Sequence, residues 1–129
     1  MSDKKQVSFK IMLVGECFVG KTNIVQTFLG NPFNEEYAST SGADYNSKEV
    51  SISIDELNKT KTIFLNIWDE TGKENYKKLV KLHFSDTQAF ILVYDITNKD
   101  TFKKLKDFWI TEIMNSYKNA KCKYIINII

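Results

Sequence analysis

The stretch Gly15-Glu16-Cys17-Phe18-Val19-Gly20-Lys21-Thr22 reads G-x-x-x-x-G-K-T, the pattern of a phosphate-binding loop. Residues 7–14 in front of it are rich in apolar and β-branched side chains, which predicts a strand. Residues 23–29 behind it carry apolar side chains at helical spacing. This motif requires a glycine loop between a strand and a helix, because loop N–H groups and the positive end of the helix dipole then face one anion. The chain is therefore predicted to bind the phosphates of a nucleotide at this loop.

The residues of the loop and of the helix start have separate expected tasks. Lys21 supplies a positive charge near the β- and γ-phosphates, and the hydroxyl of Thr22 is suited to ligate Mg²⁺. A chance glycine turn before a helix is the alternative, but a Lys-Thr pair directly after the second glycine has no packing reason. The predicted nucleotide-binding residues of this segment are Gly15, Glu16, Cys17, Phe18, Val19, Gly20, Lys21, Thr22 and Asn23.

The composition describes an ordinary globular chain. Its 129 residues predict a single domain, and 43% hydrophobic with 26% charged residues is typical of such domains. A net charge of +2 is too small to indicate nucleic acid as a partner. Cys17 and Cys122 form neither a disulfide framework nor a metal-ligand spacing, which favours a reducing, cytoplasmic compartment. The sequence contains no apolar run of the ~20 residues that span a membrane, no signal peptide and no lipidation cysteine at its end.

The hydrophobic pattern predicts an alternation of strands and helices. The predicted strands cover residues 7–14, 47–54, 61–68, 89–95 and 123–129, and the predicted helices cover 23–29 and about 73–83. A last helix is expected to begin at Asp100 or Thr101, with apolar positions at Phe102, Leu105, Trp109, Ile113 and Tyr117. This order predicts an α/β fold: a mostly parallel sheet with helices on both faces and one antiparallel hairpin at the edge.

A second phosphate element follows the strand at 61–68. Asp69-x-x-Gly72 lies at a strand end, and the carboxyl ends of parallel strands are where such sheets bind ligands. The Asp69 carboxylate is expected to hold Mg²⁺, usually through water, while the Gly72 N–H meets a γ-phosphate oxygen. A simple turn aspartate is the alternative. Thr40, one of several hydroxyls in the preceding polar loop, is a candidate to close over Mg²⁺ and the γ-phosphate.

Four stretches together resemble the small GTPases of the Ras superfamily, most of all the Rab branch: GECFVGKT at 15–22, YASTSGADY at 37–45, WDETGKENY at 68–76 and ILVYDITNKDTF at 91–102. The resemblance implies a P-loop NTPase-type fold with GTP and GDP as ligands and Mg²⁺ as cofactor. It makes Thr40 the switch residue that senses the γ-phosphate, and it suggests that Phe33 packs on the guanine edge rather than in a core or loop. The implied catalytic residues are Lys21, Thr40, Gly72 and Lys73, and the implied metal ligands are Thr22, Thr40 and Asp69.

The resemblance also implies contacts with effector proteins through regions 37–45 and 68–84. Rab-like proteins present an aromatic cluster there, and Tyr45 and Trp68 match two of its positions. The third position falls on His83, where the family usually has an aromatic hydroxyl. A solvated helix residue is an equally good interpretation of His83.

The sequence departs from the family pattern at three places. Lys73 stands where the family has a glutamine that orients the attacking water; an ammonium cannot accept a hydrogen bond, so slow hydrolysis is expected. Phe18 and Cys17 replace the usual small loop residues. The 129 residues end at about the point where the guanine-reading N-K-x-D motif is expected, which predicts a fold incomplete at its C-terminus.

The sequence therefore predicts a Rab-like switch that hydrolyses GTP to GDP in vesicle traffic, cytoplasmic or peripheral on endomembranes. The main alternative is a non-catalytic, truncated binding module with weak or no guanine selectivity, because of Lys73 and the missing N-K-x-D motif. A P-loop ATPase or kinase is the third interpretation. It is disfavoured because the sequence contains nothing that resembles an adenine clamp or lid.

Overall fold

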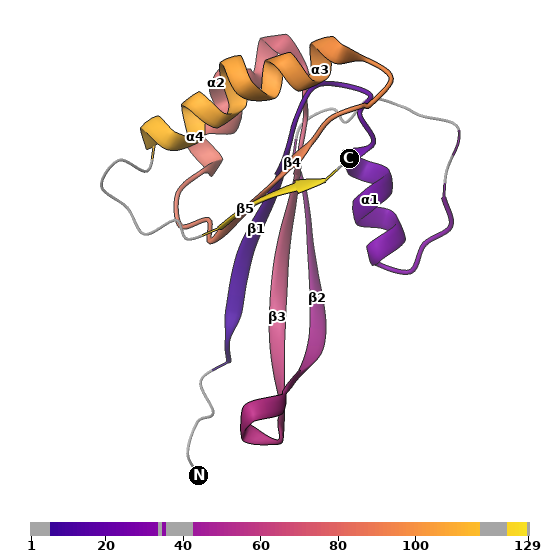
Figure 1. Ribbon diagram of the computed structural model, residues 1–129, viewed down its shortest axis with the longest axis vertical. Coiled ribbons are helices and arrows are strands. Elements are labelled where there is room, and N and C mark those ends of the chain that lie inside the picture. Colours follow the sequence, from indigo (N-terminus) through magenta and orange to yellow (C-terminus); the bar gives the residue numbers. More distant parts are fainter. Residues whose placement is uncertain (1–5, 34, 36–42, 117–123, 129) are drawn as a thin grey trace.

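The computed structural model describes residues 6–33, 35 and 43–116 together with the backbone of 124–128. Five strands form one sheet in the order β2-β3-β1-β4-β5 (Figure 1). Only the β2–β3 pair is antiparallel; the other three pairs are parallel. The strands are β1 (Ser8–Val14), β2 (Ala43–Ile54), β3 (Lys59–Glu70), β4 (Ala89–Val93) and β5 (Tyr124–Ile128). The predicted fold class, a mostly parallel sheet with one antiparallel edge hairpin, is confirmed.

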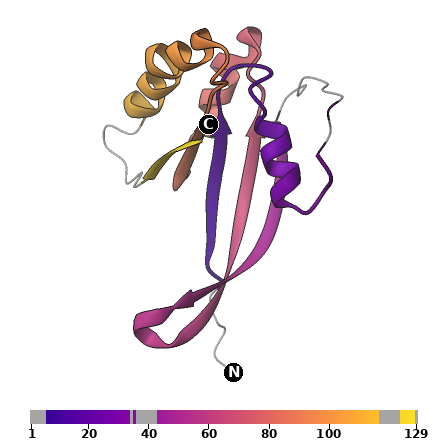
Figure 2. The same cartoon turned by 45° about the vertical axis from the view of Figure 1, so that its right-hand side comes forward.

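Helices cover both faces of this sheet (Figures 1 and 2). On one face lies α1 (Lys21–Phe28), and on the other lie α2 (Lys77–Val80), α3 (Lys99–Lys104) and α4 (Ile110–Ser116). A π-helical turn, η4 (Leu105–Trp109), joins α3 to α4 without a break. Three short 3₁₀ turns complete the elements: η1 (Asp55–Leu57), η2 (Glu74–Tyr76) and η3 (Lys81–His83).

Each face of the sheet has its own hydrophobic core. Alternate residues of β1 point to opposite faces, so Met12 and Val14 join one core and Leu13 joins the other. The larger core lies under α2, α3 and α4 and contains Val80, Phe84, Phe90, Leu92, Leu105, Trp109 and Ile113. The smaller core lies under α1 and contains Val25, Ile67 and Val93. Burial of each large apolar side chain contributes about 1.5–3 kcal/mol to the stability of the fold. The two cores therefore hold in place the strand ends that carry the polar residues described below.

The β2–β3 hairpin extends beyond the rest of the sheet (Figure 2). Both strands have twelve residues, but the pairing of β1 with β3 begins only at Ser8 and Phe64. Among the described residues, no third strand therefore lies beside the tip of the hairpin, and Ile52 remains 40% exposed. The alternating pattern of residues 47–54 predicted a half-buried strand, and Val50 and Ile54 are half-buried whereas Ile52 is exposed.

Three local predictions need correction. The strand predicted at 61–68 continues to Glu70, so Asp69 and Glu70 lie inside β3. The helix predicted over 73–83 is divided into η2, α2 and η3, because this polar segment offers few residues to the core. The N-cap of α3 is Asn98, whose side chain accepts from the N–H of Asp100 at 3.2 Å, rather than Asp100 or Thr101.

The apolar positions of this last helix are also partly different from the prediction. Leu105, Trp109 and Ile113 are buried as expected. Phe102 is 46% exposed and packs on Tyr94, with ring centroids 4.9 Å apart, while the neighbouring Thr101 is buried. Tyr117 lies outside the described residues.

Candidate functional site

The loop between β1 and α1 has the backbone shape of an anion-binding nest. Phe18 and Gly20 adopt positive φ angles of 63° and 100° among residues of ordinary conformation. Gly15 begins the loop directly against β4, where a Cβ atom would lie only 2.3 Å from the carbonyl oxygen of Val93. Only glycine permits this approach, which brings the loop close to the carboxyl end of the central strands.

Lys21 is held beneath the loop. Its ammonium donates to the carbonyl oxygens of Gly15 at 2.9 Å and of Glu16 at 2.6 Å, and the residue is 4% exposed. Burial lowers the pKa of Lys21 to about 8, although the nearby Asp69 carboxylate acts in the opposite direction. The loop thus contains one buried cation beside its inward-facing N–H groups.

Thr22 and Asp69 meet at the end of β3. The Thr22 hydroxyl donates to Asp69 Oδ2 at 2.5 Å, and Asp69 is 1% exposed. Burial raises the pKa of Asp69, while the hydrogen bond from Thr22 and the charge of Lys21 lower it. Within the described part of the chain, the other oxygen, Oδ1, is buried with no hydrogen-bond partner. A buried carboxylate oxygen of this kind is one that a bound cation or a water molecule can satisfy.

These oxygen donors suit Mg²⁺. This ion prefers oxygen ligands, uses one or two carboxylates and takes its remaining ligands from water and substrate phosphates. Over residues 6–33, 35 and 43–116, no group of three or more His, Cys, Asp or Glu side chains gathers to form an all-protein metal cage. One carboxylate and one hydroxyl beside a phosphate-binding loop therefore fit Mg²⁺ better than a structural zinc.

Gly72 touches the phosphate-binding loop itself. A Cβ atom at Gly72 would lie 2.3 Å from the backbone carbon of Glu16 and 2.4 Å from the nitrogen of Cys17. The next residue, Lys73, is in extended conformation, and its N–H donates to the Thr71 hydroxyl at 3.3 Å. The structure therefore brings together the two sequence elements that were predicted to share a phosphate.

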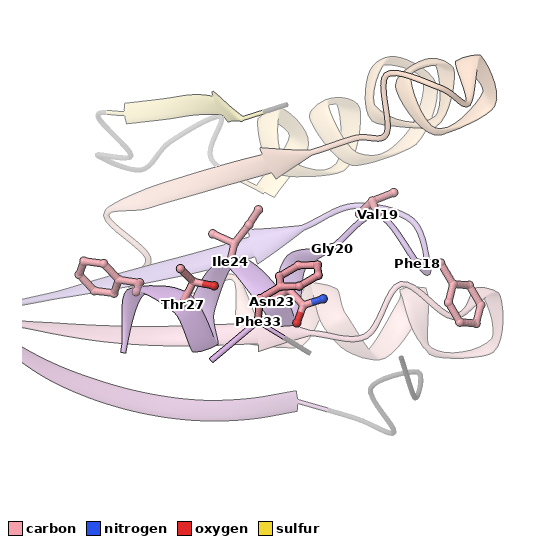
Figure 3. Close-up of a pocket in the computed structure, with 8 residues that line it drawn as sticks. Phe18, Val19, Gly20, Asn23, Ile24, Thr27 and Phe33 are labelled. Atoms are coloured by element: carbon pink, nitrogen blue, oxygen red, sulfur yellow. The ribbon is translucent and has the colours of Figure 1, made fainter. Parts of the chain in front are cut away.

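A cavity of about 620 Å³ lies beside the loop and the start of α1 (Figure 3). Its walls include the predicted nucleotide-binding residues Val19, Gly20 and Asn23. Phe33 also lines the cavity and is 67% exposed, so it is not a core aromatic. Phe18, 65% exposed, stands apart from the other side chains at the turn of the loop in the view of Figure 3.

The three predicted effector positions form one cluster. The ring centroids of Tyr45 and Trp68 are 5.3 Å apart, and those of Trp68 and His83 are 5.6 Å apart. His83 is more than a solvated helix residue, because its Nδ1 lies 2.7 Å from the buried carboxylate of Glu70. Glu70 was not singled out in the sequence, since a glutamate at a strand end is usually exposed.

Sequence reasoning did not place two further side chains, Lys77 and Trp109, at the site. Lys77 and Trp109 both contact the side chain of Glu16, a loop residue for which only a backbone role was expected. Lys77 is one of several lysines in a polar stretch, and nothing in the local pattern separates it from its exposed neighbours.

Some predicted residues lie outside the described residues. Thr40 is one of them, as are residues 37–42 of the first effector region and Cys122. None of the described helices is both long and apolar enough to cross a lipid bilayer.

Comparisons with known proteins agree with this geometry. The model of the Ras family matches residues 10–128. The chain is 36% identical to GTP-binding protein YPT52 of Saccharomyces cerevisiae over 84% of this chain and 47% of that protein. It is 35% identical to Ras-related protein RABC2b of Arabidopsis thaliana over 90% of this chain and 53% of that protein. It is 36% identical to human Ras-related protein Rab-21 over 92% of this chain and 50% of that protein. The chain spans about half the length of the curated relatives it matches.

Proposed function

Because the chain belongs to the Ras family, with Rab-named relatives, we propose that it is a Rab-like switch that binds GTP and GDP and hydrolyses GTP. The observation that carries this proposal is the meeting of Lys21, Thr22 and Asp69 beneath the loop, with one carboxylate oxygen of Asp69 left without a partner. A cation, a hydroxyl and an unpaired carboxylate at one loop are what a magnesium-bound phosphate tail requires.

The loop binds the phosphates in this account. Its N–H groups and the N-terminus of α1 donate to the phosphate oxygens, and Lys21 exchanges its two carbonyl partners for the β- and γ-phosphates. The Gly72 N–H, which is fixed against Glu16 and Cys17, donates to the γ-phosphate from the opposite side. Together these groups stabilise the charge that develops when water attacks the γ-phosphorus and its bond to the β-phosphate oxygen breaks.

Thr22 and Asp69 would hold Mg²⁺, with Thr40 as a proposed third oxygen donor. The ion, when bound, neutralises negative charge on the β- and γ-phosphates. Asp69 must be ionised for this task. Burial raises its pKa above the ordinary value, the hydrogen bond from Thr22 and the charge of Lys21 act against that rise, and a bound cation would favour the ionised form further.

Replacing Asp69 by asparagine should separate metal binding from folding. We expect the Mg²⁺-dependent gain in GTP affinity to fall roughly 10–100-fold, the range found when a partner of a bound metal is removed. The protein without nucleotide should be equally stable or more stable, because a buried, half-satisfied carboxylate disappears. Titrations of GTP at several Mg²⁺ concentrations and urea unfolding measure the two effects. Asp107→Asn, on the exposed side of η4, is the control, and an unchanged Mg²⁺ dependence in Asp69→Asn would refute the assignment.

Lys73 is proposed to slow hydrolysis. Its ammonium can donate to the γ-phosphate and so hold the triphosphate state, but it cannot orient the attacking water by accepting a hydrogen bond from it. Lys73→Gln should therefore release phosphate faster, by roughly 10- to 100-fold if the amide supplies the missing positioning. Single-turnover release from preformed GTP complexes is the measurement. A variant no faster than the parent would show that Lys73 is not the limiting feature.

The base is proposed to bind in the cavity lined by Phe33 and Asn23.

The test of the function is a Mg²⁺-dependent titration of GTP against ATP, followed by single-turnover phosphate release. Tighter binding of GTP with release supports the switch. Equally weak binding of both nucleotides without release supports the binding module with weak or no guanine selectivity, which Lys73 favours.

Effector proteins are proposed to bind the cluster of Tyr45, Trp68 and His83, together with the neighbouring surface of residues 68–84. Tyr45 is 54% exposed, and Leu79 and Leu82 on the same segment are 52% and 72% exposed, so the surface can bury apolar area. A role in vesicle traffic, at endomembranes, follows from the Rab-named relatives and is part of the proposal.

A further inference from the structure

The side chain of Glu16 joins the phosphate-binding loop to two other elements. Its Oε1 lies 2.7 Å from the ammonium of Lys77 in α2 and accepts from the indole N–H of Trp109 at 3.1 Å. Trp109 is fully buried and Lys77 is 4% exposed. One carboxylate oxygen of the loop therefore binds both a buried ammonium from α2 and a buried indole from η4.

The Lys77 side chain is buried among charged and aromatic side chains. Its ammonium also pairs with Glu74 Oε2 at 2.8 Å, and it lies 4.9 Å from the ring centroid of Phe108 and 5.7 Å from that of Trp109. Burial acts to lower the pKa of Lys77, but the hydrogen bonds with Glu16 and Glu74 outweigh it, and the pKa lies above the ordinary value. The ammonium thus keeps its charge, and loss of Glu16 would leave it with the exposed Glu74 as its remaining carboxylate partner.

The π turn η4 ends at Trp109, the residue whose indole donates to Glu16. In an ideal α-helix, residues four apart drift by about 40° around the axis. Leu105, Trp109 and Ile113 share one core, as positions four apart on an apolar helix stripe do, and the wider turn over Leu105–Trp109 changes the drift between the first two of them. Such turns are rare and frequently occur at functional sites. Here the turn allows an indole to fill the core and still reach the phosphate-binding loop.

Glu16 also contacts the catalytic elements through its backbone. Its carbonyl oxygen accepts from Lys21 at 2.6 Å, and its backbone carbon lies directly against Gly72. Gly72 and Lys77 therefore both contact Glu16: Gly72 packs against its backbone, and Lys77 pairs with its side-chain carboxylate. The four residues between them include Lys73, so the residue assigned to the γ-phosphate under the proposed function lies in a segment attached to the loop at both ends.

We propose that Lys77 is a positioning residue, which acts through Glu16 to hold residues 73–76 in register with the phosphate-binding loop. The proposal rests on the proposed function, since the group that it positions, Lys73, is assigned there to the γ-phosphate. Loss of the Glu16–Lys77 pair should loosen only the γ-phosphate side of the site. GDP, which lacks that phosphate, should bind as before.

The test compares Lys77→Met with Lys78→Met. Both variants lose one lysine charge from α2, but Lys78 is exposed whereas Lys77 is buried on Glu16. Affinities for GTP and GDP are measured with Mg²⁺ present, because their ratio reports the γ-phosphate side alone. Lys77→Met should lower the GTP-to-GDP affinity ratio by roughly five- to tenfold with GDP affinity little changed, which is the lower range of coupling between sites. Lys78→Met should leave the ratio unchanged.

Two further variants keep the proposal open to refutation if Lys77→Met folds poorly. Lys77→Arg keeps the charge and should recover most of the ratio, while Trp109→Phe keeps most of the core volume, removes the indole donor and should lower the ratio less than Lys77→Met. The emission of the remaining tryptophan in Trp68→Phe reports directly on the surroundings of Trp109, and it should change on exchange of GDP for GTP. A ratio that is the same in the parent, Trp109→Phe and every folded Lys77 variant overturns the positioning role. Failure of the parent to bind either nucleotide overturns the proposed function, and the positioning role with it.

Discussion

Replacing Gly72 by alanine should both destabilise the protein and weaken GTP binding, because the added methyl group has no space. The Cβ atom would lie 2.3 Å from the carbon of Glu16, 2.4 Å from the nitrogen of Cys17 and 2.5 Å from the oxygen of Gly15. All three are backbone atoms, so no side-chain rotation relieves the clash. Either the loop or the end of β3 must move.

Neither of these segments moves easily. Gly15 is itself packed against the carbonyl of Val93, and Asp69 lies in the paired part of β3 opposite Leu13. We expect a loss of about 1–3 kcal/mol in unfolding free energy, the usual cost of overpacking. A shift of the loop also separates Lys21 from the phosphates, so GTP affinity should fall roughly tenfold or more, equivalent to at least about 1.4 kcal/mol.

Urea unfolding and a GTP titration measure these two effects. Gly30→Ala is the control, because Gly30 has a positive φ of 90° but open space around its Cβ position. That variant should show only the modest strain of a left-handed alanine, about 1–2 kcal/mol, with unchanged GTP affinity. If Gly72→Ala bound GTP like the parent, the close packing of the two phosphate elements would have no functional meaning.

Replacing Lys21 by alanine should cause the largest loss of nucleotide affinity. The ammonium contributes charge-assisted hydrogen bonds of about 1.5–3 kcal/mol each to a charged partner. Two such bonds, to the β- and γ-phosphates, correspond to a loss of roughly 10²–10⁴-fold. Because Lys21 is already buried under the loop at 4% exposure, little side-chain entropy has to be lost when a nucleotide binds.

Lys10→Ala is a matched control for Lys21→Ala. Lys10 also bridges two backbone carbonyls, those of His83 and Ser85, and its ammonium lies over the ring of Trp68 rather than under the phosphate-binding loop. Its removal should cost some stability and leave nucleotide affinity unchanged. An affinity in Lys21→Ala within about threefold of the parent, less than about 0.7 kcal/mol, would mean that the phosphates bind elsewhere.

The parts of the site that lie on regular elements could be predicted from the sequence. The strand–loop–helix around residues 15–22 follows from an apolar run, two glycines and a helical spacing, all of which are local signals. Asp69 was predicted at the same edge of the sheet because parallel strands end together, and the pairing of β1 with β3 puts it opposite Leu13.

The parts that depend on distant contacts could not be predicted. The buried state of Lys77 depends on Glu16, sixty-one positions away in the sequence, and on a π turn that no local pattern indicates. Likewise, the pairing of His83 with Glu70 depends on β3 continuing two residues beyond its last apolar side chain. Polar residues in an apparently solvated stretch carry no periodic signal, so only the folded chain shows which of them are enclosed.

The most direct test of the whole account compares GTP, GDP and guanosine as ligands of this chain, with and without Mg²⁺. The account holds that main-chain N–H groups, Lys21 and a cation held by Thr22 and Asp69 bind the phosphate tail. It predicts that both nucleotides bind at least about a hundredfold more tightly than guanosine, a difference of about 2.8 kcal/mol, and that Mg²⁺ strengthens the binding of GTP. No measurable affinity for GTP in the presence of Mg²⁺, or a guanosine affinity equal to that of GTP, would contradict it.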